Sequence, residues 1–140
     1  MNGHLAVIDV LRNSAAANYV GGSGVTNARI FAGDPGETEP LPYIYTETFD
    51  AEAFDTTSGA ATTDHDLVKV FICDTKENDT NGGARTIAAA SRTALDETGG
   101  TYNGYTVENI RYLRVDTYDV HLTNRRMRVH EQDYEVRIRV

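Results

Sequence analysis

The side chains best suited to metal chemistry are spread along the whole sequence. The four histidines are His4, His65, His121 and His130. None lies four residues from another, and none stands at a zinc-site spacing from a cysteine or carboxylate. His65 is flanked by Asp64 and Asp66, but neighbours in a strand point to opposite faces, so the three cannot converge. The sequence therefore predicts no metal site.

Residues 74–79 have a superficial likeness to a calcium-binding loop. Asp74, Lys76 and Asn78 occupy alternate positions, where such a loop needs oxygen ligands, and the lysine would bring a positive charge into the cage. The sixth position is Asp79 instead of glycine. The segment is better explained as a hydrophilic turn in which Asn78 or Thr80 caps a helix.

Two other features could suggest catalysis or phosphate binding. Cys73, the single cysteine, ends the apolar run at 70–73, which predicts a buried, inert thiol and excludes an intrachain disulfide. A chain without a disulfide suits a reducing cytoplasm. Gly21–Gly24 follows a predicted helix and no Lys-Ser or Lys-Thr pair comes after it, so it predicts a helix stop and not a phosphate loop. No cofactor is predicted.

Acidic side chains are numerous, and a buried pair could act as general acid and base. The candidates are Glu47, Asp50, Glu52, Asp55, Asp116 and Asp119. Most stand among Thr, Ala and Gly, which indicates solvated positions, although a small cytoplasmic enzyme using Asp116 and Asp119 stays an alternative. The basic cluster of Arg125, Arg126 and Arg128 could meet an acidic face of a neighbouring subunit or consist of ordinary loop charges.

The bulk composition is typical of one globular domain, and we expect residues 1–140 to form a single domain. Hydrophobic residues make up 40% of the chain and its formal net charge is −8. That charge disfavours a protein that grips nucleic acid through its phosphates. The apolar stretch from His4 to Leu11 lacks a basic flank, and no stretch approaches the roughly 18 apolar residues of a membrane span. We therefore expect a protein that is neither secreted by the general route nor embedded in a membrane.

Hydrophobic periodicity predicts two helices and four main strands. Glycines and Asp34-Pro35-Gly36 separate them, and residues 29–31 form a short extended piece. The expected helices are Leu5–Ala17 and Ala84–Glu97, and the expected strands are Tyr43–Phe49, Asp66–Cys73, Tyr105–Val115 and Met127–Val140. We expect loops at Thr56–Asp64 and Asp119–Arg126.

The order of these elements predicts an α+β fold with a mostly antiparallel four-stranded sheet packed against two helices. Strand Asp66–Cys73 is apolar on both faces, which is typical of a central strand. In the last strand Tyr134, Val136 and Ile138 alternate with Glu135, Arg137 and Arg139. This alternation predicts one buried and one exposed face.

The order and spacing of five segments carry a family resemblance over nearly the whole chain. They are the amphipathic helix Leu5–Ala17, the piece Arg29–Gly33, Leu41-Pro42-Tyr43-Ile44, the strand Leu67–Cys73, and Gly82-Gly83-Ala84-Arg85 at the start of an alanine-rich helix. In this arrangement the chain resembles the tail-completion, or tail-terminator, proteins of long-tailed phages and of phage-like gene transfer particles.

The resemblance implies a structural role in the tail or neck of a virion, after assembly in the host cytoplasm. Such a protein would cap the finished tail tube as a ring of six subunits, stop tail polymerisation and meet the head connector or stopper protein. DNA would pass through the ring without specific binding, and no catalysis or membrane would be involved. From loop position and expected exposure, the predicted subunit contacts are Phe49, Phe54, Asp119, His121, Arg125, Arg126 and Met127. Another neck component, the small enzyme and a peptide-binding adaptor are the alternatives.

Overall fold

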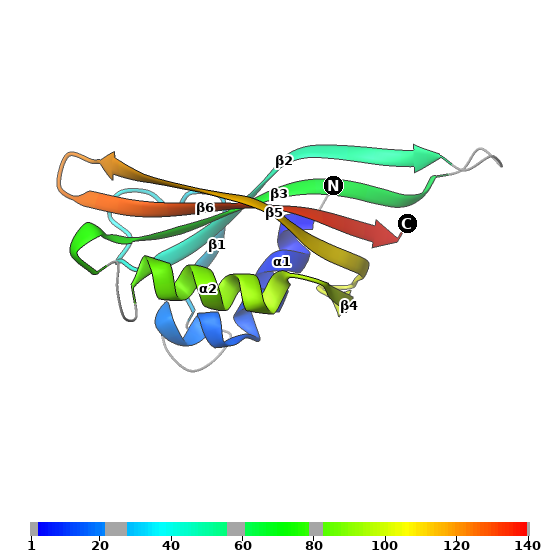
Figure 1. The fold of residues 1–140 in the computed structure, drawn as a ribbon, viewed down its shortest axis with the longest axis horizontal. Helices are drawn as coiled ribbons and strands as arrows, with labels where there is room; N and C mark the ends of the chain where they lie inside the picture. Colours follow the sequence, from blue (N-terminus) through cyan, green and yellow to red (C-terminus); the bar gives the residue numbers. More distant parts are fainter. Residues whose placement is uncertain (1–2, 22–27, 56–60, 79–82, 140) are drawn as a thin grey trace.

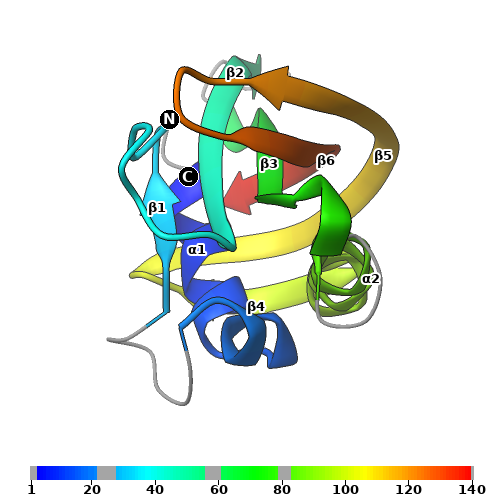
Figure 2. The same ribbon diagram turned by 90° about the vertical axis from the view of Figure 1, so that its left-hand side faces the viewer.

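A computed structural model describes residues 3–21, 28–55, 61–78 and 83–139, with the backbone alone at 50–55 and 61–64. Its centre is a curled six-stranded sheet in the order β1-β2-β3-β6-β5-β4, with both α-helices on one face (Figures 1 and 2). The strands are β1 Ile30–Ala32, β2 Tyr43–Asp55, β3 Ala61–Thr75, β4 Thr98–Tyr102, β5 Tyr105–His121 and β6 Arg126–Arg139. The helices are α1 Gly3–Arg12 and α2 Ala84–Leu95, with short 3-10 helices η1 Ala15–Tyr19 and η2 Lys76–Asn78.

The prediction of an α+β fold with two α-helices is confirmed, but the sheet is six-stranded and mixed instead of four-stranded and antiparallel. β1 pairs with β2 in parallel. A three-residue strand rises only about 10 Å, so the loop 33–42 can return along it without a helix.

β1 matches the short extended piece expected at 29–31, so the strand missing from the prediction is β4. It pairs with β5 through a hairpin at Asn103-Gly104, where both residues have positive φ angles of 51° and 80°. The pair Gly99-Gly100 had indicated only a helix stop. A Cβ on Gly99 would lie 2.8 Å from the carbonyl oxygen of Glu108, so the glycine allows the close approach of β4 to β5.

The hairpin of β5 and β6 extends further than the polar sequence at 119–126 suggested. Asp119 pairs with Arg128 and Val120 with Met127 in the strand register. The polar side chains are accommodated because Arg128 Nε bonds Asp119 at 2.5 Å. Of the loop expected at Thr56–Asp64, residues 61–64 extend β3, and residues 56–60 lie outside the described part.

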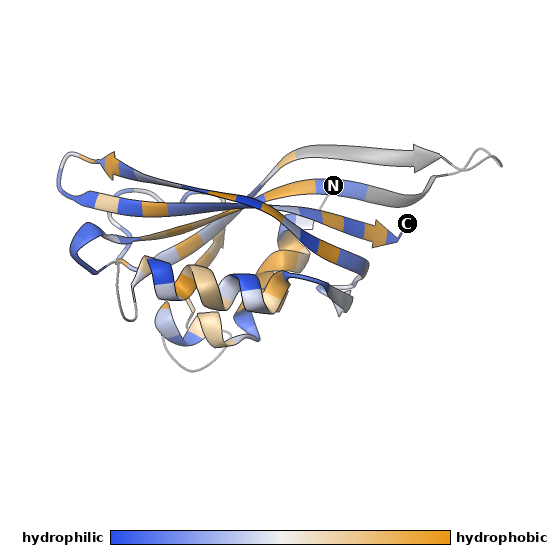
Figure 3. Ribbon diagram, in the orientation of Figure 1, coloured by the Kyte–Doolittle hydropathy of each residue, from blue (hydrophilic) through white to orange (hydrophobic). Residues whose placement is uncertain are grey.

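The main core lies between the sheet and the helices. Val7 and Leu11 of α1 and Ile87 and Leu95 of α2 are fully buried against sheet residues such as Tyr134. Hydrophobic and hydrophilic residues alternate along β6 (Figure 3), as its sequence predicted. The expected position of β3 inside the sheet is also confirmed, since it pairs with β2 on one side and with β6 on the other.

Candidate functional site

A second hydrophobic cluster lies on the sheet face opposite the helices. Gln132 donates to the carbonyl oxygen of Ala88 in α2 at 2.9 Å, so it faces the helices. Strand side chains alternate, which places Val129 and Met127 on the other face. There they pack with Tyr43, Phe71 and Cys73. This face also meets the loop 33–42, which joins β1 to β2.

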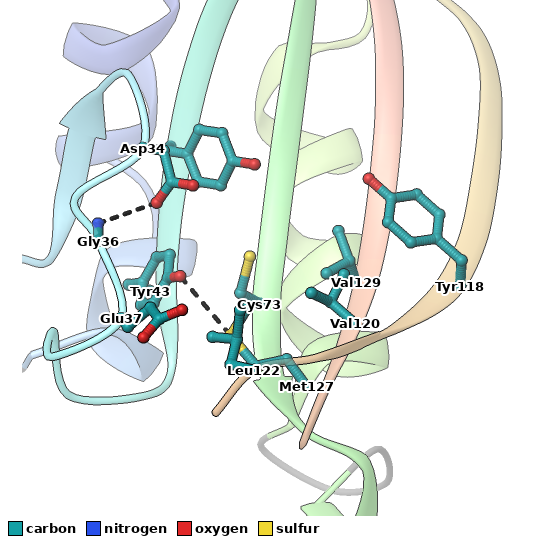
Figure 4. A pocket seen from close by; sticks show the side chains of 11 residues that line it. Asp34, Gly36, Glu37, Tyr43, Cys73, Tyr118, Val120, Leu122, Met127 and Val129 are labelled. Carbon is teal, nitrogen blue, oxygen red and sulfur yellow. Dashed lines mark hydrogen bonds between the residues drawn. The ribbon is translucent and has the colours of Figure 1, made fainter. Parts of the chain in front are cut away.

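These residues enclose a hollow of about 210 Å³ at the end of the sheet near the β5–β6 turn (Figure 4). We call it the aromatic hollow. Strands β2, β3, β5 and β6, the turn between β5 and β6, and the loop 33–42 contribute to it. Its lining consists of Asp34, Gly36, Glu37, Tyr43, Tyr45, Cys73, Tyr118, Val120, Leu122, Met127 and Val129.

Aromatic contacts hold the β2 side of the aromatic hollow in place. Tyr45 stacks on Phe71 with ring centroids 4.4 Å apart, and Phe31 of β1 meets Tyr43 edge-on at 6.3 Å. The Tyr43 hydroxyl donates to the sulfur of Met127 at 3.6 Å (Figure 4). Such contacts fix ring orientation as well as burying apolar area.

The interior of the hollow is uncharged, whereas its rim carries carboxylates. Burial is the main cause that raises the pKa of the Cys73 thiol to about 12 and that of the Tyr118 hydroxyl to about 12. Burial likewise raises the pKa of Tyr43. These groups therefore stay neutral at physiological pH. The exposed carboxylates of Asp34 and Glu37 are the charges in the lining, so the hollow suits an apolar side chain beside a cation.

Arg125 at the hairpin turn ties the loop to the sheet. Its Nη1 donates to the carbonyl oxygen of Glu39 at 2.6 Å, and its guanidinium carbon lies 5.9 Å from the centre of the Tyr43 ring. Within the described part of the chain, its Nε and Nη2 are buried and have no hydrogen-bond partner. Arg125 had been predicted as a subunit contact, and its contacts inside the subunit position the wall of the hollow.

The other polar residues predicted as contacts lie close together on the same hairpin. His121 and Arg126 are exposed and face each other in the last pair of β5 and β6. Asp119 is bonded by Arg128 and lies 3.5 Å from the Nζ of Lys76. The hydrogen bond from Arg128 is the main cause that lowers the pKa of Asp119.

The apolar members of the predicted contact set have different positions. Phe49 is 44% exposed, with the Nζ of Lys69 4.7 Å from the centre of its ring. Met127 was expected to be exposed, but this was wrong: it is only 6% exposed because the strand alternation turns it into the second cluster. The side chain of Phe54 lies outside the described part. Whether these residues contact another subunit stays a prediction.

Beyond the hollow, ion pairs cover the same face of the sheet. Asp133 accepts from the Nε of Arg114 at 2.8 Å and lies 3.4 Å from the Nζ of Lys69. Arg137 and Arg111 both reach Glu135, at 3.2 and 3.9 Å. This face is therefore apolar at one end and charged at the other.

The candidate catalytic groups do not converge. Asp116 pairs with Glu131 in the strand register, whereas Asp119 is engaged by Arg128. Nδ1 of His4 lies 2.8 Å from the hydroxyl of Thr48, and Nδ1 of His130 lies 3.2 Å from that of Thr117. Among the residues that the structure describes, no group of three or more His, Cys, Asp or Glu side chains could hold a metal ion.

The sequence contained a signal for the hollow, because Tyr43 and Tyr45 share one face of β2 in its alternation. No local pattern in the sequence indicated the residues of the other walls of the hollow. Cys73 is 1% exposed and Val129 3% exposed, and only their register, in which Cys73 pairs with both Tyr43 and Val129, brings them together.

Two stretches of sheet edge are unpaired within the described residues. β4 pairs with β5 only as far as Ile110, so residues 111–121 pair with β6 alone. β1 pairs with β2 only at 44–46, so residues 47–55 pair with β3 alone. Such edges can bind a strand of another chain.

Comparison with known proteins agrees with this architecture. Residues 5–139 match the family described as Tail completion protein gp17. A chain of a solved structure titled "Virion of native gene transfer agent (GTA) particle" is 18% identical, with a TM-score of 0.70 over 96% of this chain and 92% of that chain. At this identity the likeness concerns the fold.

A second solved structure, 14% identical over 89% of this chain and 87% of the other, has a TM-score of 0.49, which is too low to support an argument. No protein with a curated description matches significantly. No helix in the described ranges is long and apolar enough to cross a membrane. Because the family match covers nearly the whole sequence, this chain belongs to the tail completion protein gp17 family and is a structural tail protein of a phage virion.

Proposed function

We propose that this protein caps the finished tail tube as a ring of six subunits. The ring ends tail polymerisation and presents the surface that the head-side connector or stopper protein meets. The observation that carries the proposal is the family match over residues 5–139. The fold that 96% of this chain shares with a chain of a gene transfer agent particle supports it.

The two unpaired sheet edges support a ring. They lie on different strands, residues 111–121 of β5 and residues 47–55 of β2. When two unlike surfaces of one chain meet, the contact is heterologous, and repeated heterologous contacts close into a ring if the rotation permits. Pairing between β5 of one subunit and β2 of the next would satisfy both edges.

The acidic character of the chain suits a channel for DNA. A formal charge of −8 on each subunit would repel phosphate and let the genome slide through the ring without specific binding. The function needs no catalysis, cofactor or membrane. The protein would act through its contacts with itself, with the tail tube protein and with the head-side connector.

The test is electron microscopy of tails from particles that lack this protein. We expect overlong tails or tails without heads, because nothing would stop the tube or join it to the head. Purified protein added to isolated tail tubes should bind at one end as a ring and make them competent to join heads.

The same experiment separates the proposal from another neck function. A protein acting only on the head side would leave tails of normal length when it is missing. Normal particles in its absence, or purified protein that never binds tail tubes, would overturn the proposal.

A further inference from the structure

Strand β5 carries an exposed apolar patch flanked by arginines. The described residues include four exposed large hydrophobic side chains, Tyr19, Phe49, Leu113 and Val115. Leu113 is 40% exposed and Val115 47% exposed, and both lie in the part of β5 that has no partner strand on its outer edge. Arg111 and Arg114 are their neighbours in sequence and pair with Glu135 and Asp133 on the hollow side of the sheet, whereas Val115 pairs with Gln132, which faces the helices. We call residues 111–115 the β5 patch.

The arginines of the β5 patch retain capacity for another partner. Arg114 uses its Nε to bond Asp133 at 2.8 Å, yet its side chain is 75% exposed. Arginine has five donors, so the outer part of its guanidinium can bond a second carboxylate. The contact of Arg111 with Glu135 is longer, at 3.9 Å, and therefore weaker than the bond between Arg114 and Asp133.

The aromatic hollow has the complementary chemistry. Its interior is aromatic and aliphatic, and its lining contains two carboxylates, Asp34 and Glu37, and no cationic side chain. No residue of the β5 patch lines it, so the chain does not fill its own hollow with these side chains. The hollow begins at Tyr43 and Tyr45 of β2, next along that strand from its unpaired edge at 47–55.

We propose that the β5 patch of one subunit docks into the aromatic hollow of the next. Leu113 would supply the apolar contact, and Arg114 would bond Glu37 at the rim. The inference rests on the proposed ring and names the two surfaces that build it. The contact is heterologous, as a closed ring requires, and it continues the pairing of a β5 edge with a β2 edge.

Charge reversal and rescue test the pairing. The variants are Glu37→Lys, Arg114→Glu and the two combined, with Leu113→Ser as a separate probe of the apolar contact. Arg85→Glu, an exposed arginine of α2, is the control with the same change of charge as Arg114→Glu. Association would be measured by sedimentation over a wide concentration range and by counting rings on purified tail tubes, after melting curves show that each variant is folded.

We expect Glu37→Lys, Arg114→Glu and Leu113→Ser each to weaken association by roughly tenfold or more. The combined charge swap should recover most of that loss, and Arg85→Glu should leave association unchanged. Rings that form equally well with all these variants would overturn the docking and leave the proposed function standing.

Two further outcomes would overturn the pairing or the proposed function. Weakening by Leu113→Ser without rescue in the combined charge swap would mean that β5 docks on another surface, which overturns the pairing. Wild-type protein that forms no ring, either alone or on tail tubes, would overturn the proposed function itself.

Discussion

At the scale of single residues, two consecutive buried hydrogen bonds join β6 to α2. The Tyr134 hydroxyl donates to Oε1 of Gln132 at 2.7 Å, and Nε2 of Gln132 donates to the carbonyl oxygen of Ala88 at 2.9 Å. Tyr134 and Gln132 are almost fully buried. Each buried polar atom in these bonds needs its partner to be hydrogen-bonded, because no water replaces a lost bond.

Tyr134→Phe should therefore destabilise the protein by about 1–3 kcal/mol, because Oε1 of Gln132 loses its donor. Urea unfolding should show a lower midpoint with an unchanged slope. Tyr102→Phe is the matched control, since its hydroxyl bonds the Gly99 carbonyl oxygen at an exposed site and should cost no more than about 0.5 kcal/mol. Equal effects in both variants would contradict this role of the buried hydrogen bonds.

His4 should make stability depend on pH. Burial is the main cause that lowers its pKa below the usual 6.5, against the opposing charge of Asp66. Between the lowered value and 6.5, the unfolded chain binds more protons than the folded one. The contribution of His4 to the free energy of unfolding is therefore complete above pH 6.5. It is lost as the pH falls through 6.5 toward the pKa of the folded state.

His4→Asn should thus lose less stability than the wild type when the pH is lowered from about 7.5 to about 5. Urea unfolding at several pH values would measure this. His121→Asn, at an exposed position, controls for the general effect of removing a histidine. If the free energy of unfolding changes with pH in the same way for the wild type and His4→Asn, His4 contributes nothing to acid sensitivity.

At the scale of elements, the start of α1 is fastened to the centre of the sheet. The amide of Gly3 donates to Oδ2 of the buried Asp66 in β3 at 2.7 Å. An added Cβ at Gly3 would lie 2.7 Å from that oxygen and 2.8 Å from the Cβ of Asp66. The glycine thus lets the helix approach the strand.

Gly3→Ala should destabilise the protein by about 1–3 kcal/mol, because the helix must move away from β3. Chemical denaturation would give the value, and hydrogen exchange should show faster opening of α1 than of α2. Helix propensity alone favours alanine over glycine by roughly 1 kcal/mol. A more stable variant would therefore mean that the contact with Asp66 does not restrict the helix.

Irregular pairing changes which faces β5 presents. Its register with β6 shifts between Val107 and Asn109 and again between Tyr112 and Arg114. As a result Val107 and Ile110 both reach the core, although simple alternation in the sequence placed them on opposite faces. Leu113, which has no partner at the second shift, and Val115, which pairs with Gln132 beyond it, are both exposed.

At the scale of the whole molecule, the two hydrophobic clusters share strands. The core under the helices and the cluster at the hollow lie on opposite faces of β2, β3 and β6. Val70 and Ile72 of β3 belong to the first, and Phe71 and Cys73 between and beside them belong to the second. Loss of one cluster therefore disturbs the other.

We expect one cooperative unfolding transition for the chain, as for a single domain. Calorimetry should give a van't Hoff enthalpy equal to the calorimetric enthalpy. Separate monitors should agree: tyrosine fluorescence, to which the aromatic hollow contributes, and far-ultraviolet circular dichroism. Two resolved transitions would mean that the hairpin end of the sheet unfolds independently.

The sequence by itself determined the α+β class, two helices, the buried character of β3 and the alternating faces of β6. Each depends on periodicity along one segment, as in Tyr134, Val136 and Ile138. It also predicted an inert Cys73, whose pKa burial raises. Local periodicity reports which face of an element is apolar, but not which distant segment covers it.

Only the tertiary structure decided the parallel pairing of β1, the added strand β4, the unpaired edges and the aromatic hollow. The hollow joins Asp34, Tyr43, Cys73 and Val129 from four separate segments. Met127 looked exposed in the sequence because it follows a polar loop, and the register of β6 buried it. Contacts between segments far apart in the chain depend on strand register and bulges, and these leave no pattern within any one segment.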